Sequence, residues 1–249
     1  MKVSIITVCF NSELTIQETI ESVNNQTHKN IEHIFIDGRS TDNTLRIISE
    51  ISNSCKVISE NDNGIYDAMN KGILLSEGDI ICILNSDDVF FDDFVLENVV
   101  KVFKMHDVDA VYGNIVMCSE KDWVNKKVTR KWVTGTQKSF TNGWHPPHPA
   151  LFVKKTKYQE LGMFKPKYRI SADFELMLRF FEVYKIKASY LNFFLVRMRM
   201  GGTSTRSIKN IIIGNINIRK SFFENGVTYN YTYPFFRAMN KLKQYFLQF

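Results

Sequence analysis

The sequence of 249 residues lacks the patterns that mark several classes of protein. It contains only 5 Pro and 12 Gly, without a low-complexity segment, a linker or an internal repeat, so we expect one large globular unit. Its apolar runs fall far short of the roughly 18 residues that suggest a membrane-spanning helix. The first eight residues are too short and too strand-like for a signal peptide. These absences point away from fibrous, disordered and membrane-spanning proteins.

Cysteine is scarce and shows no metal-binding spacing. Cys9, Cys55, Cys82 and Cys118 form no CxxC pair, and two of them lie inside apolar, strand-like segments. We therefore expect reduced, buried thiols in a cytoplasmic protein, rather than disulfides or zinc ligands.

The net charge of +6 is distributed unevenly. Acidic residues outnumber basic ones over residues 1–98, and the basic excess lies in clusters at 126–131, 197–206 and 237–243. Basic segments suit nucleic acid, phosphorylated ligands or an anionic membrane surface. Because no RNA- or DNA-binding module accompanies them, nucleic acid is the least favoured of these partners.

Strand-like and helical patterns alternate along the first half of the chain. The predicted strands are 3–10, 31–36, 56–59 and 80–84, and segments with apolar residues three and four apart separate and follow them. This alternation predicts an α/β fold whose parallel sheet is covered on both faces, with the ligand site beyond the carboxyl ends of the strands. A further strand-like segment is at 108–117. The pattern of residues 120–150 is less regular, and it predicts a second half of mixed structure built around the edge of the sheet. Further helices are expected over 173–184 and 208–225, with an extended segment at 190–200.

The most informative stretch is residues 80–88 (IICILNSDD), where five apolar residues are followed by two adjacent carboxylates, Asp87 and Asp88. Desolvating two neighbouring anions costs several kcal/mol unless a cation or hydrogen-bond donors compensate. Carboxylates at the end of a parallel strand are suited to hold Mg²⁺ or Mn²⁺ against a phosphate. The alternative is that one of them caps a helix beginning near Asp92.

The glycine-rich phosphate loops GxGxxG and GxxxxGK[ST] are both absent. A sheet without such a loop, but with clustered carboxylates, is better suited to a nucleotide diphosphate bridged by a metal ion.

Several motifs resemble family 2 glycosyltransferases of the GT-A fold. They are residues 3–11 (VSIITVCFN), 26–27 (QT), 37–44 (DGRSTDNT) and 84–88 (LNSDD), in matching order and spacing. The segment 59–73 (SENDNGIYDAMNKGI) is similar to a bacterial subgroup that builds surface polysaccharides, and motifs at 148–153, 161–164, 171–175 and 201–205 agree. The resemblance covers about residues 1–206.

The resemblance implies a GT-A, Rossmann-like, mostly parallel sheet flanked by helices, with a mixed acceptor-side half. We expect the chain to form a single catalytic domain over 1–230, followed by a C-terminal amphipathic tail over 231–249. Within the domain, the nucleotide-sugar half covers about 1–118 and the acceptor half about 119–230.

For the nucleotide base, the resemblance implies that Val8 and Phe10 flank it, with Phe10 as a stacking surface. The end of the second strand would contact uracil or another base. Many relatives carry two Asp there, whereas this chain has Asp37 followed by Gly38, so Asp37 either takes that contact or only shapes the turn.

For the ribose and the metal ion, the family's Asp-any-Asp motif is altered here to residues 85–88 (NSDD), which retains two acids beside Asn85. Asp88 is the first choice as ligand of Mn²⁺ or Mg²⁺, and Asp87 follows closely. Asn70 and Lys71 are further nucleotide candidates; alternatively, Lys71 is a solvated helix residue.

Asp173 matches the family's general base, the carboxylate that accepts the proton of the acceptor hydroxyl in an inverting transfer. Glu175 would lie roughly 200° around the same helix, so the two cannot both point into the site. The alternative is that Asp173 is the N-cap of the helix.

Acceptor and diphosphate contacts are expected from the later motifs. Prolines hold the loop 144–149 (WHPPHP) extended, which favours Trp144 and His148, ahead of His145, as an acceptor platform or diphosphate contact. Arg199 and Ser204, with Arg197, would close over the diphosphate; the alternative is a solvated strand face.

The function implied is an inverting, metal-dependent hexosyltransferase. It would move a hexose or N-acetylhexosamine, from UDP in particular, to a sugar on a polyprenyl diphosphate during O-antigen (lipopolysaccharide) or capsule synthesis. One alternative is a sugar-nucleotide pyrophosphorylase, although residues 11–13 (NSE) stand where its glycine- and arginine-rich loop belongs. The other is a non-catalytic carbohydrate-binding relative, favoured only by Gly38 and Asn85.

The sequence pattern of the tail predicts a basic amphipathic helix. Its apolar residues recur three and four apart, and its basic residues fall mostly off that stripe. The apolar residues are Phe235, Phe236, Met239, Leu242, Tyr245, Phe246 and Phe249. Such a helix can lie on an anionic bilayer, which places the protein peripherally on the inner face of the cell membrane. Alternatively, the stripe packs on the catalytic domain or on a second subunit of a homodimer.

Overall fold

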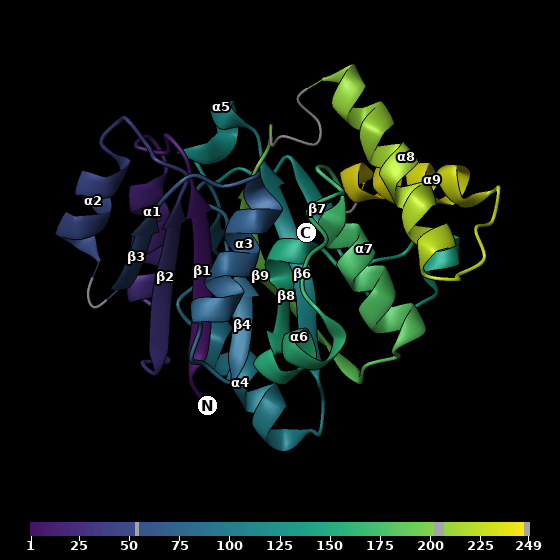
Figure 1. The fold of residues 1–249 in the computed structure, drawn as a ribbon, viewed down its shortest axis with the longest axis horizontal. Helices are drawn as coiled ribbons and strands as arrows, with labels where there is room; N and C mark the ends of the chain where they lie inside the picture. The colour runs from purple at the N-terminus through teal and green to yellow at the C-terminus, as the bar shows by residue number, and fades with distance from the viewer. Residues whose placement is uncertain (53–54, 202–206, 247–249) are drawn as a thin grey trace.

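The structure is a computed structural model that describes residues 1–52, 55–201 and 207–246. Over these residues the strands form one nine-stranded, curled sheet flanked by helices (Figure 1). The predicted α/β class is therefore confirmed.

The first half of the chain builds the parallel part of the sheet. The strands β3-β2-β1-β4 lie side by side in this order, and every neighbouring pair is parallel. Every residue of β1 is buried, as expected for a strand covered on both faces. The elements are β1 (Val3–Cys9), α1 (Ile16–Asn24), β2 (Ile31–Asp37), α2 (Thr44–Ile51), β3 (Cys55–Ser59), α3 (Ile65–Leu75) and β4 (Ile80–Ile83).

The second half is mixed, as the sequence predicts. β8 runs antiparallel to both β4 and β6, β9 runs parallel to β6, and β5 and β7 pair antiparallel with β9 and β6. The strands are β5 (Val89–Phe90), β6 (Ala110–Cys118), β7 (Arg130–Trp132), β8 (Leu151–Lys154) and β9 (Ala188–Arg199). The α-helices are α4 (Val95–Met105), α5 (Glu120–Trp123), α6 (Lys155–Leu161), α7 (Ala172–Leu178), α8 (Ile208–Glu224) and α9 (Tyr233–Phe246). The short turns are η1 (Phe140–Asn142), η2 (His148–Ala150) and the π-helical η3 (Arg179–Val183).

The core divides between the two faces of the sheet because successive side chains of a strand point to opposite faces. Ile6 and Val8 of β1 belong to the cluster that includes residues of α3 and α7. Val3 and Ile5 belong to a second cluster, which includes residues of α4. The sheet is therefore held from both sides, and its strand ends are fixed in place.

The cysteines are free thiols, as predicted. Cys9, Cys82 and Cys118 are buried, whereas Cys55 is half-buried. Burial raises the pKa of the Cys9 and Cys82 thiols well above its ordinary value.

Two of the capping alternatives are wrong. α4 begins at Val95, after an N-cap residue, Phe94, that makes no side-chain cap bond, so neither Asp87 nor Asp88 caps it. α7 begins at Ala172 with Ser171 as its N-cap, so Asp173 lies within the first turn. The helix predicted over 173–184 also changes at residue 179 into the π-helical turn η3.

Candidate functional site

The loops that follow β1, β2 and β4 meet at one edge of the sheet because their strands are parallel. The hydroxyls of Ser12 and Ser86 lie 2.9 Å apart, which joins the loops after β1 and β4. The backbone N–H of Asn11 donates to the Ser40 hydroxyl at 2.8 Å, which joins the loops after β1 and β2. This carboxyl edge is where an open α/β sheet binds ligands.

Phe10 presents an exposed ring at this edge, with 62% of its surface accessible, whereas Val8 is buried in the core. Phe10 also lies against Gly38, since a Cβ at position 38 would be 3.5 Å from its Cδ2 and only 2.9 Å from Asp62 Oδ2. Asp62 therefore occupies the space that a side chain at position 38 would take. Sequence reasoning missed Asp62, although the 59–73 motif contains it.

Asp37 is fully buried and bonds to its own turn and to the end of β3. Its carboxylate accepts hydrogen bonds from the Ser40 N–H (3.0 Å), the Ser40 hydroxyl (2.5 Å) and the Ser59 hydroxyl (2.6 Å). Of the two roles that the sequence left open, this geometry favours shaping the turn.

The acidic pair after β4 is asymmetric. Asp88 is 1% exposed, and its oxygens accept hydrogen bonds from Asn85 Nδ2 (2.9 Å) and the Arg199 backbone N–H (3.1 Å). Asp87 is half-buried and more accessible. Burial raises the pKa of both carboxyls, and the charge of Asp87 raises that of Asp88 further. Asn85 Oδ1 is buried beside them without a hydrogen-bond partner. A ligand from the carboxyl edge therefore reaches Asp87 more readily than Asp88, which reverses the order expected from the sequence.

Arg199 is fixed near this pair by acids and an aromatic ring. Its guanidinium pairs with Glu120 (2.8 Å) and Glu18 (3.2 Å) and lies 4.0 Å from the centroid of the Trp123 ring. The guanidinium of Arg197 lies 4.5 Å from the same centroid. The alternative of a solvated strand face is therefore wrong for Arg199, whose side chain is 11% exposed. Ser204 lies outside the described residues.

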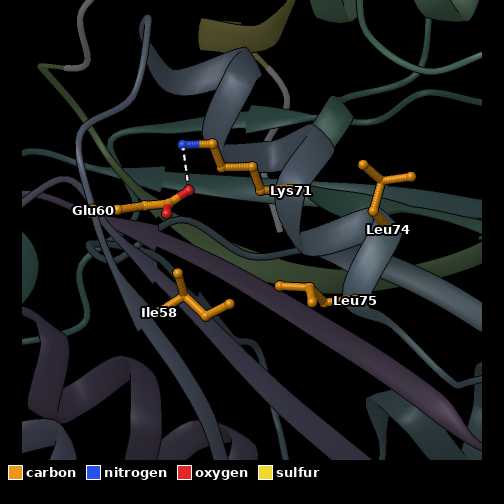
Figure 2. Close-up of a pocket in the computed structure, with 5 residues that line it drawn as sticks. All are labelled: Ile58, Glu60, Lys71, Leu74 and Leu75. Carbon is orange, nitrogen blue, oxygen red and sulfur yellow. Dashed lines mark ion pairs between the residues drawn. The ribbon is translucent and has the colours of Figure 1, made fainter.

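Asn70 and Lys71 brace neighbouring loops. The Asn70 amide donates to the Phe164 carbonyl (2.9 Å) and accepts from its N–H (3.0 Å). Lys71 Nζ lies 2.8 Å from Glu60 and donates to the Asn61 carbonyl at 2.9 Å. Figure 2 shows the Lys71 side chain directed at Glu60, above a small hollow that Ile58, Leu74 and Leu75 also line. Lys71 thus anchors the loop that carries Asp62.

Three side chains from distant segments converge near Asp173. The Tyr66 hydroxyl, at the start of α3, donates to Asp173 Oδ1 at 2.8 Å. The rings of Tyr66 and His148 pack on Phe164, with centroids 5.5 and 5.9 Å away. His148 Nε2 is buried without a partner, and burial lowers the pKa of this ring although the charge of Asp173 opposes the shift. Burial, then the charge of Asp173, raises the pKa of Tyr66 well above its ordinary value. Sequence reasoning assigned no role to Tyr66, although the 59–73 motif contains it.

Glu175 is separated from Asp173 by its environment. It is fully buried and pairs with Lys165 Nζ (2.6 Å) and Arg179 Nε (3.1 Å). Asn225 Nδ2 donates to the same carboxylate at 3.1 Å. Glu175 therefore takes part in structural ion pairs. This agrees with its expected position on a different side of the helix from Asp173.

Trp144 does not form an exposed platform. Only 7% of its surface is accessible, and its Nε1–H donates to the Thr134 carbonyl at 3.0 Å. Its ring packs edge-on against Tyr112, Phe140 and Phe181, as a core residue does. In the neighbouring His145, burial and the nearby Arg237 lower the pKa to about 4.

No group of three or more His, Cys, Asp or Glu side chains able to hold a metal occurs in the part of the chain that the structure describes. Mg²⁺ commonly takes one or two carboxylates and completes its shell with substrate phosphates and water. The oxygen-rich trio of Asp87, Asp88 and Asn85 fits a cation shared in this way.

Comparison with solved structures identifies the fold as that of GT-A glycosyltransferases. Staphylococcus aureus TarS (residues 1–349) in complex with UDP-GlcNAc superposes with a TM-score of 0.69 at 16% identity, over 96% of this chain and 69% of that one. The mannosyltransferase PcManGT from Pyrobaculum calidifontis, in complex with GDP-Man and Mn²⁺, gives a TM-score of 0.65 at 17% identity, over 96% and 72%. The chain spans 43% of the longer TarS chain.

Sequence comparison identifies the family. The chain belongs to glycosyl transferase family 2, whose family model matches residues 4–169. A "PGL/p-HBAD biosynthesis glycosyltransferase" of Mycobacterium bovis is 25% identical over 200 residues, covering 76% of this chain and 73% of that protein. An uncharacterized glycosyltransferase of Mycobacterium tuberculosis is 33% identical over 194 residues, covering 71% and 68%. The family assigned from the sequence motifs is therefore confirmed.

Proposed function

We propose that this protein transfers a hexose or N-acetylhexosamine from a nucleotide diphosphate sugar to an acceptor hydroxyl, with inversion at the anomeric carbon. The observation that carries the proposal is the hydrogen bond between Tyr66 and Asp173, from helices on the two halves of the chain. Tyr66 occupies Oδ1, which leaves Oδ2 to take the acceptor's proton. As the acceptor oxygen bonds to the anomeric carbon, the bond to the diphosphate breaks and the nucleoside diphosphate leaves with the electron pair. Glu175 is not available for this role because it is buried in ion pairs.

The donor would bind at the carboxyl edge, with its base against the exposed ring of Phe10 and its diphosphate near Asp87. Asp62, in the space above Gly38, is the further candidate for the base contact. UDP is the first donor nucleotide to test, with GDP as the comparison, since the two structural neighbours are complexes of UDP-GlcNAc and GDP-Man.

A divalent cation, Mn²⁺ or Mg²⁺, would be held by Asp87 first and Asp88 second, beside Asn85. The raised pKa of both carboxyls supports this, because a bound cation would offset the desolvation of their charges. When bound, such a cation supplies charge neutralisation at the diphosphate. The neighbouring mannosyltransferase was solved with Mn²⁺.

The acceptor would be a sugar on a polyprenyl diphosphate in O-antigen or capsule synthesis, at the inner face of the cell membrane. The support is the resemblance of the 59–73 motif to the surface-polysaccharide subgroup, together with the basic amphipathic tail. None of the described helices is both long and apolar enough to cross a bilayer.

Incubation with Mn²⁺, a synthetic GlcNAc-diphosphate-lipid and a panel of UDP-sugars and GDP-mannose tests the proposal. We expect release of the nucleoside diphosphate and a β-linked product from an α-linked donor. Donor binding without release would favour the non-catalytic relative, and formation of UDP-sugar from UTP and a sugar 1-phosphate would favour the pyrophosphorylase. Retained anomeric configuration would contradict Asp173 as a general base.

A further inference from the structure

The C-terminal helix α9 packs with its polar face toward the protein. Tyr233 is buried, and Arg237, Asn240 and Gln244 are half-buried on the same side. Asn240 Nδ2 donates to the carbonyl of Gly143 at 3.2 Å, on the loop after η1. The spacing 233, 237, 240, 244 defines one face of a helix with 3.6 residues per turn. This face fixes α9 to the body through the hydrogen bond of Asn240 and through packing of the Tyr233 ring against Phe174 and Phe222.

The opposite face of α9 is apolar and exposed to solvent. Its members are between 39% and 63% exposed: Phe235, Phe236, Met239, Leu242 and Tyr245. At roughly 100° per residue, Lys241 falls on one flank of this stripe, and Lys243 falls near its other edge, between Met239 and Phe236. The orientation is the reverse of that in an ordinary surface helix, whose apolar stripe faces the core.

α8 exposes a second apolar row beside α9. Its buried side contains Gly214, Ile218, Ser221 and Phe222. Its exposed isoleucines are Ile208, Ile211, Ile212 and Ile216. Arg237 of α9 donates to Asn215 Oδ1 of α8 at 2.6 Å, which brings the two helices together. Figure 1 shows both at the end of the molecule opposite β3 and α2.

The charge of this region is strongly positive. Residues 207–246 contain six Lys and Arg against one Glu, which is +5 of the chain's net +6. That acid, Glu224, is already paired with Lys167 at 2.5 Å. Two copies packed through this region would bring like charges together, whereas an anionic bilayer surface complements them.

We propose that the exposed rows of α8 and α9, called here the docking surface, bind the headgroup region of an anionic lipid bilayer. The docking surface consists of Ile208, Ile211, Ile212 and Ile216 with Phe235, Phe236, Met239, Leu242 and Tyr245. The apolar side chains enter the acyl boundary, and the flanking lysines extend to the headgroups. α9 needs no rearrangement, because polar contacts already hold its apolar face outward.

α8, whose opposite side carries the isoleucines of the docking surface, packs near the segment that carries the proposed catalytic base. Asn217 Nδ2 of α8 donates to the Ile170 carbonyl at 2.8 Å, three residues before Asp173. Binding of α8 to the bilayer would thus hold the segment before Asp173 near the membrane that anchors a lipid-linked acceptor. This functional meaning rests on the proposed function, whereas bilayer binding itself does not.

Vesicle co-sedimentation of the full chain tests the docking surface. Vesicles of phosphatidylcholine alone are compared with vesicles that contain 30% phosphatidylglycerol, at low and high salt. We expect binding to the anionic vesicles that weakens at high salt, and about a tenfold loss of partitioning in Phe235→Ser/Leu242→Ser. Ile212→Ser/Ile216→Ser should also lose partitioning, and Lys241→Gln/Lys243→Gln should lose it on anionic vesicles only. The matched control is Leu74→Ser/Met105→Ser, which removes exposed apolar side chains elsewhere and should bind normally.

Several outcomes would overturn the docking surface. One is that the natural sequence does not bind anionic vesicles. Another is that either apolar double variant partitions like the natural sequence. A third is that the protein forms a dimer in solution that those variants dissociate. Asp173→Asn should bind vesicles like the natural sequence, so bilayer binding without sugar transfer would refute only the proposed function. Transfer to a water-soluble acceptor analogue without vesicle binding would refute only the docking surface.

Discussion

The two sides of the candidate site are built in different ways. At the donor edge, short loops after parallel strands bond to one another, as in the contact between Asn11 and Ser40. On the acceptor side, Tyr66 and Asp173 are 107 residues apart in sequence. Motifs thus determine most of the donor edge, whereas the acceptor side exists only when the whole sheet has formed. Substitutions on the two sides should separate these contributions.

The largest effect is expected for Asp173→Asn. Because the amide keeps the shape but loses the basicity, turnover should fall about 10²–10⁴-fold with donor affinity and melting temperature unchanged. Glu175→Gln is the matched control, and it should instead destabilise the fold, by about 3 kcal/mol or more, because Arg179 loses its charged partner. Kinetics and thermal unfolding of both variants give the measurement. Near-normal turnover in Asp173→Asn would remove the base assigned here.

The second comparison is within the acidic pair. Asp87→Asn should abolish the rise in melting temperature that Mn²⁺ with UDP produces, and should lower turnover about 100-fold, because it removes the accessible ligand. Asp88→Asn should keep part of the melting-temperature rise and part of the turnover. The amide can still accept a hydrogen bond from the Arg199 N–H, and Asn85 can reorient. The reverse order of effects would restore Asp88 as the principal ligand, and full activity in EDTA would exclude a required cation.

Tyr66→Phe should have a smaller effect on the acceptor side. The ring keeps its contact with Phe164, but Asp173 loses the hydrogen bond that orients it, so kcat should fall about tenfold, equivalent to about 1.4 kcal/mol. The donor KM should not change. Tyr190→Phe, which loses hydrogen bonds to Asn114 and Asn192, is the control. Equal kcat values for the three proteins would show that Tyr66 does not position the base.

The smallest effect on turnover is expected at Glu32, which lies at the opposite end of β2 from the donor edge. Burial disfavours its charge, but hydrogen bonds from the Ser4 hydroxyl, the Glu77 N–H and Lys2 outweigh burial and lower its pKa from 4.5 to about 2. Its ionised form therefore stabilises the fold above about pH 4.5, and this contribution is lost as the pH falls toward 2.

Glu32→Gln should lower the free energy of unfolding by about 1–2 kcal/mol at pH 7, with the difference from the natural sequence shrinking below pH 4.5. Chemical denaturation at several pH values gives the measurement, and turnover should stay normal. A pH-independent difference would show that packing, rather than charge, is what Glu32 contributes.

The amino-acid pattern was sufficient to predict the architecture of the first half and the position of the ligand edge. Apolar runs such as 80–84 are stable only when they are buried on both faces of a sheet. Because such runs alternate with helical patterns, few topologies besides a parallel sheet remain possible. The motifs at 37–44 and 84–88 also indicated the family. Their polar residues form local turns, and the conformation of such turns depends little on contacts with distant parts of the chain.

Which polar residues are accessible depends on long-range packing, which the sequence pattern does not reveal. Asp87 and Asp88 are adjacent in sequence, yet the Arg199 backbone on β9 covers Asp88 and leaves Asp87 more open. Trp144 looked like a platform, but β6 and η3 enclose it in the core. The α9 stripe was predictable from its period, whereas its outward direction follows from the polar anchors at Arg237 and Asn240. A sequence pattern gives the period of a face, and only long-range packing determines what that face meets.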